Sequence, residues 1–279
     1  MAVDGRYILE NSFSARLKSD SCLMGSNVTD IGVLNANGSK TIIVTDCNDK
    51  RVKRFYEHHG NMAHSWLDVE SEPRGLAKIA DNTVVVSLHG SRELCFIRVD
   101  SEMYVSSRVN ADKEYYGLSS IDANTIAASA PWHHPPTVDV IDTEGKVLVS
   151  INKDADGKDL FASPKYLTVT PSRDILVSDI MKISLTCVTS SGKVKWVFQP
   201  NDQSVLAEPR GVACNTVGEI FLADNNEHKI LKLSPDGVFL SNVFTRVDNM
   251  VWPVGICVDS SGKLYITQSE GEIKVYTPQ

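Results

Sequence analysis

The chain has 279 residues, of which 42% are hydrophobic and 23% charged, and this composition excludes disordered and fibrous proteins. Its formal charge of −7 argues against a DNA-binding protein and against one that coats nucleic acid with its whole surface. No apolar run reaches the roughly 20 residues of a membrane-spanning helix, and residues 1–6 begin no apolar signal segment. We therefore expect a cytoplasmic protein without membrane contact.

The six cysteines support this expectation. They include no C-x-x-C pair, so the thiolate spacing of a structural zinc site is absent. Most lie inside apolar runs, as Cys95 and Cys257 do, where a free thiol packs as a small core residue. The cysteines favour a reduced protein, and the sequence predicts neither a metal nor a cofactor.

The first predicted strand is the N-terminal run at residues 6–13, and six similar units follow it along the chain. The units open at residues 30–33, 72–77, 116–118, 163–167, 208–213 and 252–256. Their anchor positions are Gly32, Gly75, Gly117, Tyr166, Gly211 and Gly255, at intervals of 42 to 49 residues. This regular spacing predicts a repeat architecture in which each unit is one small sheet.

Each unit predicts four strands. After a turn, the second strands lie at residues 42–45, 84–87, 126–129, 175–178, 220–223 and 264–267. These runs are almost continuously apolar, which is typical of strands covered on both faces. Third strands, such as residues 230–233, alternate between polar and apolar residues, and a fourth strand follows, as at residues 194–198. We therefore predict an all-β fold, a six-bladed β-propeller, as a single domain over residues 1–279.

The sixth unit ends after its third strand, close to the C-terminus, whereas the N-terminal run has no unit of its own. We predict that residues 6–13 supply the outer strand of the sixth blade and close the ring. Closure removes the open seam at which a repeat array frays. Deleting residues 1–15 is then expected to destabilise the whole domain.

The pattern P-x-G-[VIL]-A, turn, strand ending in Asp, polar loop and K/R-[VI] resembles the NHL repeat, most clearly at residues 209–230. The whole chain is similar to the C-terminal propellers of tripartite-motif (TRIM-NHL) proteins. The resemblance implies the recognition domain of a RING ubiquitin ligase, in which the propeller selects the target protein. The strand-ending Asp is present as Asp46, Asp179 and Asp224, and we assign Ser87, Ser129 and Gln268 to its place elsewhere. We interpret this Asp as a structural acceptor of backbone N–H groups from its loop.

Loops between second and third strands gather with the blade entries on one face of a propeller, where partners bind. The longest such loop carries Trp132, His133 and His134 among three prolines. Trp132 either anchors a partner or folds onto a neighbouring blade, and the sequence leaves both open. Arg74, Lys165 and Arg210 occupy equivalent entry positions and form either a basic arc or pairs with nearby glutamates. The candidate partner-binding residues are Trp132, His133, His134, Arg74, Lys165, Arg210, Arg92, Tyr116 and Tyr166.

An RNA-binding function is the alternative, because some TRIM-NHL propellers bind RNA on this face. We assign eight basic and ten acidic residues to it, which lacks the cationic excess of a phosphate-reading surface. Calcium- or zinc-dependent propeller hydrolases and lyases need convergent oxygen or imidazole ligands, and the predicted inner strands offer mainly apolar residues. We therefore expect no catalytic residues and no metal site, and a protein as the partner.

Overall fold

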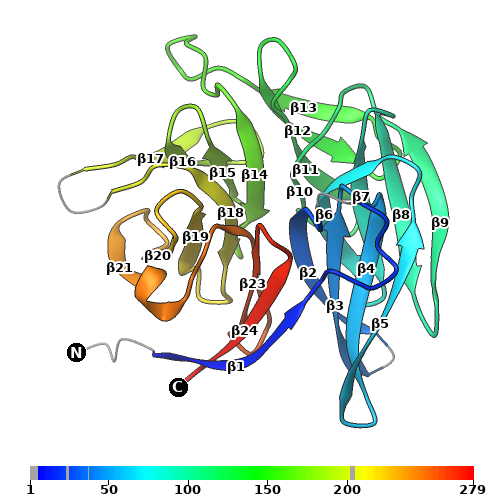
Figure 1. Cartoon of the computed structure of the whole chain (residues 1–279). Helices are drawn as coiled ribbons and strands as arrows, with labels where there is room; N and C mark the ends of the chain where they lie inside the picture. The colour runs from blue at the N-terminus through cyan, green and yellow to red at the C-terminus, as the bar shows by residue number, and fades with distance from the viewer. Residues whose placement is uncertain (1–5, 23–24, 37, 202–204) are drawn as a thin grey trace.

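The computed structural model describes residues 6–22, 25–36, 38–201 and 205–279, and these form six four-stranded antiparallel sheets around a common axis (Figure 1). The predicted all-β, six-bladed propeller is thus confirmed. The described residues contain one 3-10 helix, η1 (Arg246–Asp248), and no helix long and apolar enough to cross a membrane.

The strands follow the predicted units in chain order. The first blade is β2 (Val28–Ala36), β3 (Ser39–Asp46), β4 (Arg51–His58) and β5 (Asn61–Asp68), and the second is β6 (Glu72–Ala80), β7 (Thr83–His89), β8 (Glu93–Val99) and β9 (Met103–Asn110). The third is β10 (Leu118–Ser120), β11 (Thr125–Ala130), β12 (Thr137–Asp142) and β13 (Val147–Ile151), and the fourth is β14 (Pro164–Val169), β15 (Ile175–Asp179), β16 (Ser184–Val188) and β17 (Val194–Phe198). The fifth is β18 (Pro209–Cys214), β19 (Ile220–Asp224), β20 (Lys229–Leu233) and β21 (Phe239–Phe244), and the sixth is β22 (Pro253–Val258), β23 (Leu264–Gln268), β24 (Glu272–Pro278) and β1 (Tyr7–Ser14).

Burial changes from the middle to the outside of each blade. Every residue of β15 is buried, because the neighbouring sheets cover both faces of a second strand. The outer strand β17 alternates between half-buried and exposed residues, with one face toward solvent. The hydrophobic core accordingly lies between adjacent blades, where side chains of one sheet pack on the next.

The predicted closure is confirmed by the pairing of β1 with β24, from Tyr7 opposite Pro278 to Ser14 opposite Glu272 (Figure 1). Aromatic side chains fix both ends of β1. The ring of Tyr7 lies 6.1 Å from that of Phe221 in the fifth blade, and the ring of Phe13 lies 5.1 Å from that of Phe55 in the first blade. The N-terminal strand therefore holds three blades together.

The strand registers correct the predicted anchor of the first blade. In the second blade, Leu76 pairs with Val86, two residues before Leu88, the partner of the entry residue Pro73. In the first blade, Ile31 pairs with Val44, two residues before Asp46, the partner of Val28. Asp30, the residue before Ile31, is thus equivalent to Gly75, and the predicted anchor Gly32 is wrong by two positions. The first unit lacks the entry proline, so nothing local in its sequence fixed the alignment.

The registers also correct two predicted equivalents of the strand-ending Asp. Pro73 pairs with Leu88, as Pro209 pairs with Asp224, so Leu88 and not Ser87 takes this place. In the third blade the place belongs to Ala130 and not to Ser129. The predicted assignment was wrong because the apolar replacements gave no polar marker to align.

The structural role of the Asp is confirmed, and it extends beyond its own loop. Asp179 accepts hydrogen bonds from the backbone N–H groups of Met181 and Lys182 in its loop, and from those of Ala162 and Ser163 in the segment entering the blade. Asp224 likewise binds the entry segment through the N–H groups of residues 207 and 208. Each Asp ties the entry of its blade to the turn after the second strand.

Glycine lets the inner strands approach one another closely. A Cβ atom on Gly211 would lie 2.4 Å from the carbonyl oxygen of Val254 in the next blade, and one on Gly75 would lie 2.2 Å from that of Tyr116. No side chain fits there without separating the backbones of adjacent blades.

We expect Gly211→Ala to lower the free energy of unfolding by roughly 3 kcal/mol, because the methyl group meets backbone that cannot rotate away. The control is Gly157→Ala, at φ +77° with nothing within 4 Å of the added carbon, which costs about 1 kcal/mol of backbone strain. Urea unfolding measures both. Equal losses would show that contact between the inner strands does not decide the effect.

Candidate functional site

Six equivalent positions, one in each blade, line one end of the central channel. They follow the entry proline, or the residue in its place, and are Thr29, Arg74, Tyr116, Lys165, Arg210 and Val254. Together with Asn27, Tyr166, Ile180 and Ser269 they surround a cavity of about 340 Å³, which we term the channel mouth. The predicted candidates Arg74, Lys165, Arg210, Tyr116 and Tyr166 thus lie together.

Hydroxyl groups of the second strands hold the backbone at this mouth. Ser87 Oγ accepts a hydrogen bond from the N–H of Gly75 and donates one to the carbonyl oxygen of Tyr116 in the next blade, at 2.7 Å. Ser129 Oγ donates in the same way to the carbonyl oxygen of Lys165, at 2.8 Å. These bonds bridge adjacent blades, so the mouth presents its side chains from a fixed frame.

Both interpretations of the basic residues hold in part. Arg74 Nη2 lies 2.5 Å from a carboxylate oxygen of Glu72, and Arg210 Nη2 lies 2.7 Å from one of Glu208, so each guanidinium pairs within its own blade. All three cations nevertheless line the same cavity. Burial, together with the nearby charges of Arg210 and Arg74, lowers the pKa of Lys165. The mouth therefore concentrates positive charge that the two glutamates offset incompletely.

Two tyrosines lie among these cations. The hydroxyl oxygens of Tyr116 and Tyr166 are 3.2 Å apart, and their rings meet edge to face with centroids separated by 5.3 Å. The guanidinium of Arg74 lies 5.7 Å from the ring centroid of Tyr116, and the ammonium of Lys165 lies 5.6 Å from it. Burial raises the pKa of both hydroxyls, so they remain neutral hydrogen-bond donors.

Trp132 folds onto a neighbouring blade, which is one of the two alternatives that the sequence left open. Its ring packs on His89 of the second blade, at 4.6 Å between centroids, and on Tyr116, at 5.6 Å. It nevertheless keeps 42% of its surface exposed. His133 and His134 follow it at exposed positions. Trp132 is therefore a supported aromatic surface beside the mouth.

Arg92 lies away from the mouth. It lines a separate cavity of about 190 Å³ with Trp132, His133 and the acidic residues Asp112 and Glu114. Its backbone has φ +54°, and its carbonyl oxygen accepts the N–H of Ala111. Among the candidates, Arg92 thus joins the tryptophan loop and not the basic arc.

A second exposed tryptophan was missed by the sequence analysis. Trp252 precedes the entry proline of the sixth blade and keeps 40% of its surface exposed at φ +43°. The backbone N–H of Trp252 donates a hydrogen bond to Nδ1 of His228, at 3.0 Å between the nitrogens. The centroids of the two rings lie 5.2 Å apart. A bulky residue in this strained conformation marks a candidate functional position. The carbonyl oxygen of Trp252 accepts hydrogen bonds from Ser269, which lines the mouth, and Trp132 packs on Tyr116. The two tryptophans therefore lie beside the mouth in the sixth and third blades, on opposite sides of the ring.

The same inner strands line a further cavity of about 290 Å³ along the channel. Asp30 is the one acidic side chain among its described lining residues, and its carboxylate accepts the N–H groups of Ile31 and Leu76. Burial raises the pKa of Asp30 to about 7. Burial also raises the pKa of the lining thiols, to about 11 for Cys214 and about 12 for Cys257, which leaves them poor nucleophiles.

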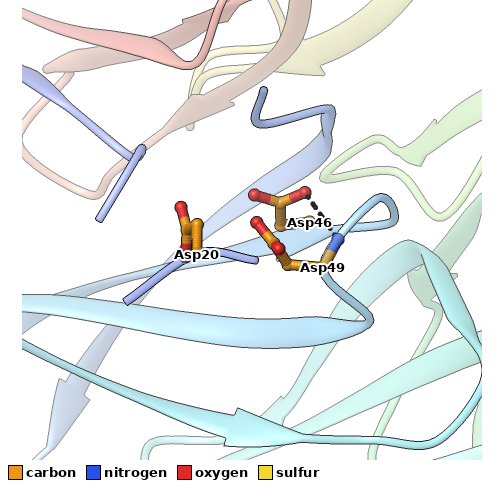
Figure 2. A group of neighbouring side chains, drawn as sticks. All are labelled: Asp20, Asp46 and Asp49. Atoms are coloured by element: carbon orange, nitrogen blue, oxygen red, sulfur yellow. Dashed lines mark hydrogen bonds between the residues drawn. The ribbon is translucent and has the colours of Figure 1, made fainter. Parts of the chain in front are cut away.

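Three carboxylates converge beside the first blade: Asp46 and Asp49 belong to it, and Asp20 lies in the segment that precedes β2 (Figure 2). Asp20, Asp46 and Asp49 each offer an oxygen within 4.8 Å of the others, and Asp46 accepts the N–H of Asp49. The ammonium of fully buried Lys53 lies 2.8 Å from Asp20, 2.7 Å from Asp46 and 3.7 Å from Asp49. Its further hydrogen bonds go to the carbonyl oxygen of Ala15 and to Ser26 Oγ. Lysine therefore supplies the charge that a metal ion would otherwise bring.

No family model and no curated protein matches the chain. Among solved structures, a putative gluconolactonase has a TM-score of 0.69 at 15% identity, over 100% of this chain and 94% of the other. A catalytically inactive virginiamycin B lyase from Staphylococcus aureus, with quinupristin, has 0.63 at 12%, over 98% and 99%. The WD40 propeller domain of Doa1 has 0.66 at 10%, over 97% of each chain. At these identities the likeness shows the propeller fold alone.

Proposed function

We propose that the chain is a non-catalytic recognition domain that binds a protein partner through the face around the channel mouth. The observation that carries this proposal is the pair of exposed tryptophans, Trp132 and Trp252, each supported by a histidine on opposite sides of the mouth. Tryptophan contributes more binding free energy at protein interfaces than most residues, above all when it is held rigidly. The propeller frame supplies that rigidity.

The chemistry of the mouth supports recognition over catalysis. Its described lining residues offer guanidinium, ammonium, amide and neutral hydroxyl groups, and none of them is a carboxylate, imidazole or thiol that could act as base or nucleophile. The resemblance of the repeats to the NHL family supports a role in choosing substrates for a TRIM-type ubiquitin ligase. The WD40 propeller among the similar structures is consistent with a binding domain.

RNA remains the competing ligand, because three cations line one cavity. Fewer acidic side chains are exposed on this face than the ten predicted, since Asp46, Asp179 and Asp224 are fully buried in their loops. The pairing of Arg74 and Arg210 with glutamates weakens this alternative, because phosphate binding needs a net cationic surface.

Trp132→Ala and Trp252→Ala are each expected to weaken partner binding by tenfold or more, as loss of a central aromatic anchor costs about 2 kcal/mol. The matched control is Trp66→Ala, which removes a tryptophan of similar exposure, 38%, from the outer strand of the first blade. Affinity capture with quantitative mass spectrometry identifies the partners of the unaltered protein, and titration with the purified partner measures each variant. Equal affinity in all three variants would contradict the proposed face.

A further inference from the structure

We propose that the channel mouth binds carboxylate side chains of an acidic peptide segment in the partner, an inference that rests on the proposed protein-binding function. The site consists of Arg74, Lys165 and Arg210 with the hydroxyls of Tyr116 and Tyr166. The inserted carboxylate supplies the anion that this cavity lacks.

Two donors in the mouth have no acceptor among the described residues. Lys165 Nζ, set between Arg74 and Arg210, makes no hydrogen bond or ion pair with any of them, and its contact is the face of Tyr116. Arg74 Nε is buried and has no hydrogen-bond partner. For Arg74 Nε, a buried donor without an acceptor costs free energy that a bound anion recovers, whereas Lys165 is half-buried and its ammonium is free to meet a ligand. These unused donors therefore point to an anionic ligand.

The tyrosine pair adds a third donor. Tyr116 and Tyr166 share one hydrogen bond between their hydroxyls, and this bond uses one of the two hydroxyl protons. The second proton has no acceptor among the described residues, and both rings line the cavity. A carboxylate has two oxygens and about four acceptor positions, enough for a tyrosine hydroxyl, the ammonium and a guanidinium together.

The dimensions and surroundings favour a peptide over RNA. A cavity of about 340 Å³ admits one or two side chains, whereas a nucleic-acid backbone needs a cationic track that continues across the surface. Glu72 and Glu208 lie immediately beside the cations, so the cationic surface does not continue from the cavity as a track for a nucleic-acid backbone. A single acidic side chain of a peptide can enter the cavity and reach the cations, because the residues on either side of it in the peptide need not be charged. Its neighbours then contact Trp132 and Trp252 on the rim.

The probe is a fluorescein-labelled hexaglutamate peptide, titrated with the full chain at low salt and followed by fluorescence anisotropy. We expect saturable binding that weakens as salt is added, because the cations lie near the surface. Lys165→Met is expected to weaken this binding about tenfold, because the lost ion pair is intermediate between an exposed pair and a fully desolvated one. Lys165 donates no hydrogen bond in the free protein, so the melting temperature of the variant stays close to that of the unaltered chain.

The matched control is Lys146→Met, which removes the same charge from an exposed turn at the opposite end of the blades and should leave binding unchanged. The proposal is overturned if hexaglutamate binds the two variants with equal affinity. It is also overturned if hexaglutamate does not bind the unaltered chain. A single-stranded RNA of equal charge that binds more tightly and also depends on Lys165 overturns it in favour of phosphate.

The two proposals fail separately. If hexaglutamate binding depends on Lys165 while Trp132→Ala keeps full affinity for the purified partner, the proposed face is wrong and the anion site stands. If Trp132→Ala abolishes binding of the partner while Lys165→Met binds hexaglutamate with unchanged affinity, the proposed face stands and the anion site is wrong.

Discussion

Removal of residues 1–15 is expected to abolish the cooperative unfolding of the ring, because β1 is the outer strand of the sixth blade and carries aromatic contacts to both neighbouring blades. Loss of the half-buried Tyr7 and Phe13 side chains alone is worth roughly 3–5 kcal/mol together. The deletion also leaves the β24 edge unpaired, which promotes association between chains. Thermal unfolding followed by circular dichroism, with size-exclusion chromatography, measures both effects.

A synthetic peptide of residues 6–15 provides the control. It is expected to bind the truncated chain along β24 and to restore part of the lost melting temperature, as the register from Tyr7 to Ser14 is set by pairing with β24. The same peptide with Tyr7 and Phe13 replaced by alanine should restore less. An unchanged melting temperature after truncation would show that β1 does not close the ring.

Lys53→Met is expected to lower the free energy of unfolding by roughly 3–5 kcal/mol at neutral pH, since it leaves buried carboxylates without their cation. Methionine keeps the length and much of the volume of the lysine stem, so the loss reports charge and hydrogen bonding. The control is Lys78→Met, which breaks an exposed pair with Asp81 and should change stability little. Urea unfolding at pH 7 compares the variants.

The difference in free energy of unfolding between the unaltered protein and Lys53→Met should shrink as the pH falls from 7 to 5. In the unaltered protein, burial would raise the pKa of Asp20, but hydrogen bonds from Lys53, from the N–H of Leu17 and from Arg51 hold it below its usual value. That stabilisation is present at neutral pH and is lost only in strong acid. Without Lys53 the burial of Asp20 favours its protonated form, so the variant gains stability relative to the unaltered protein as the pH falls. A deficit independent of pH would contradict this account of the cluster.

The repeat pattern was sufficient to predict the blades and their closure. Continuous apolar runs such as residues 220–223 are buried on both faces, and the N-terminal run pairs where the sixth unit lacks a strand. The first blade was misaligned, because Asp30 occupies a place that glycine holds in four other blades. A local pattern cannot identify such a replacement; the strand register does.

The candidate site was predicted in part for a similar reason. Arg74, Lys165 and Arg210 could be grouped because each follows an entry proline, which fixes the same position in each blade. The Trp252–His228 pair was missed, because it joins residues from two blades that no sequence motif connects. The Lys53 cluster was missed too, since Asp20 lies in a segment before the first repeat.

The bridging bonds from Ser87 and Ser129 reach the backbone of the mouth residues and leave their side chains uninvolved. Ligand preference at this end of the channel can therefore diverge one residue at a time while the scaffold stays intact. Changing Lys165 to glutamate would reverse the charge preference of the mouth, whereas Thr29 and Val254 are buried and belong to the scaffold itself. The same framework can thus carry chemically opposite ligand preferences.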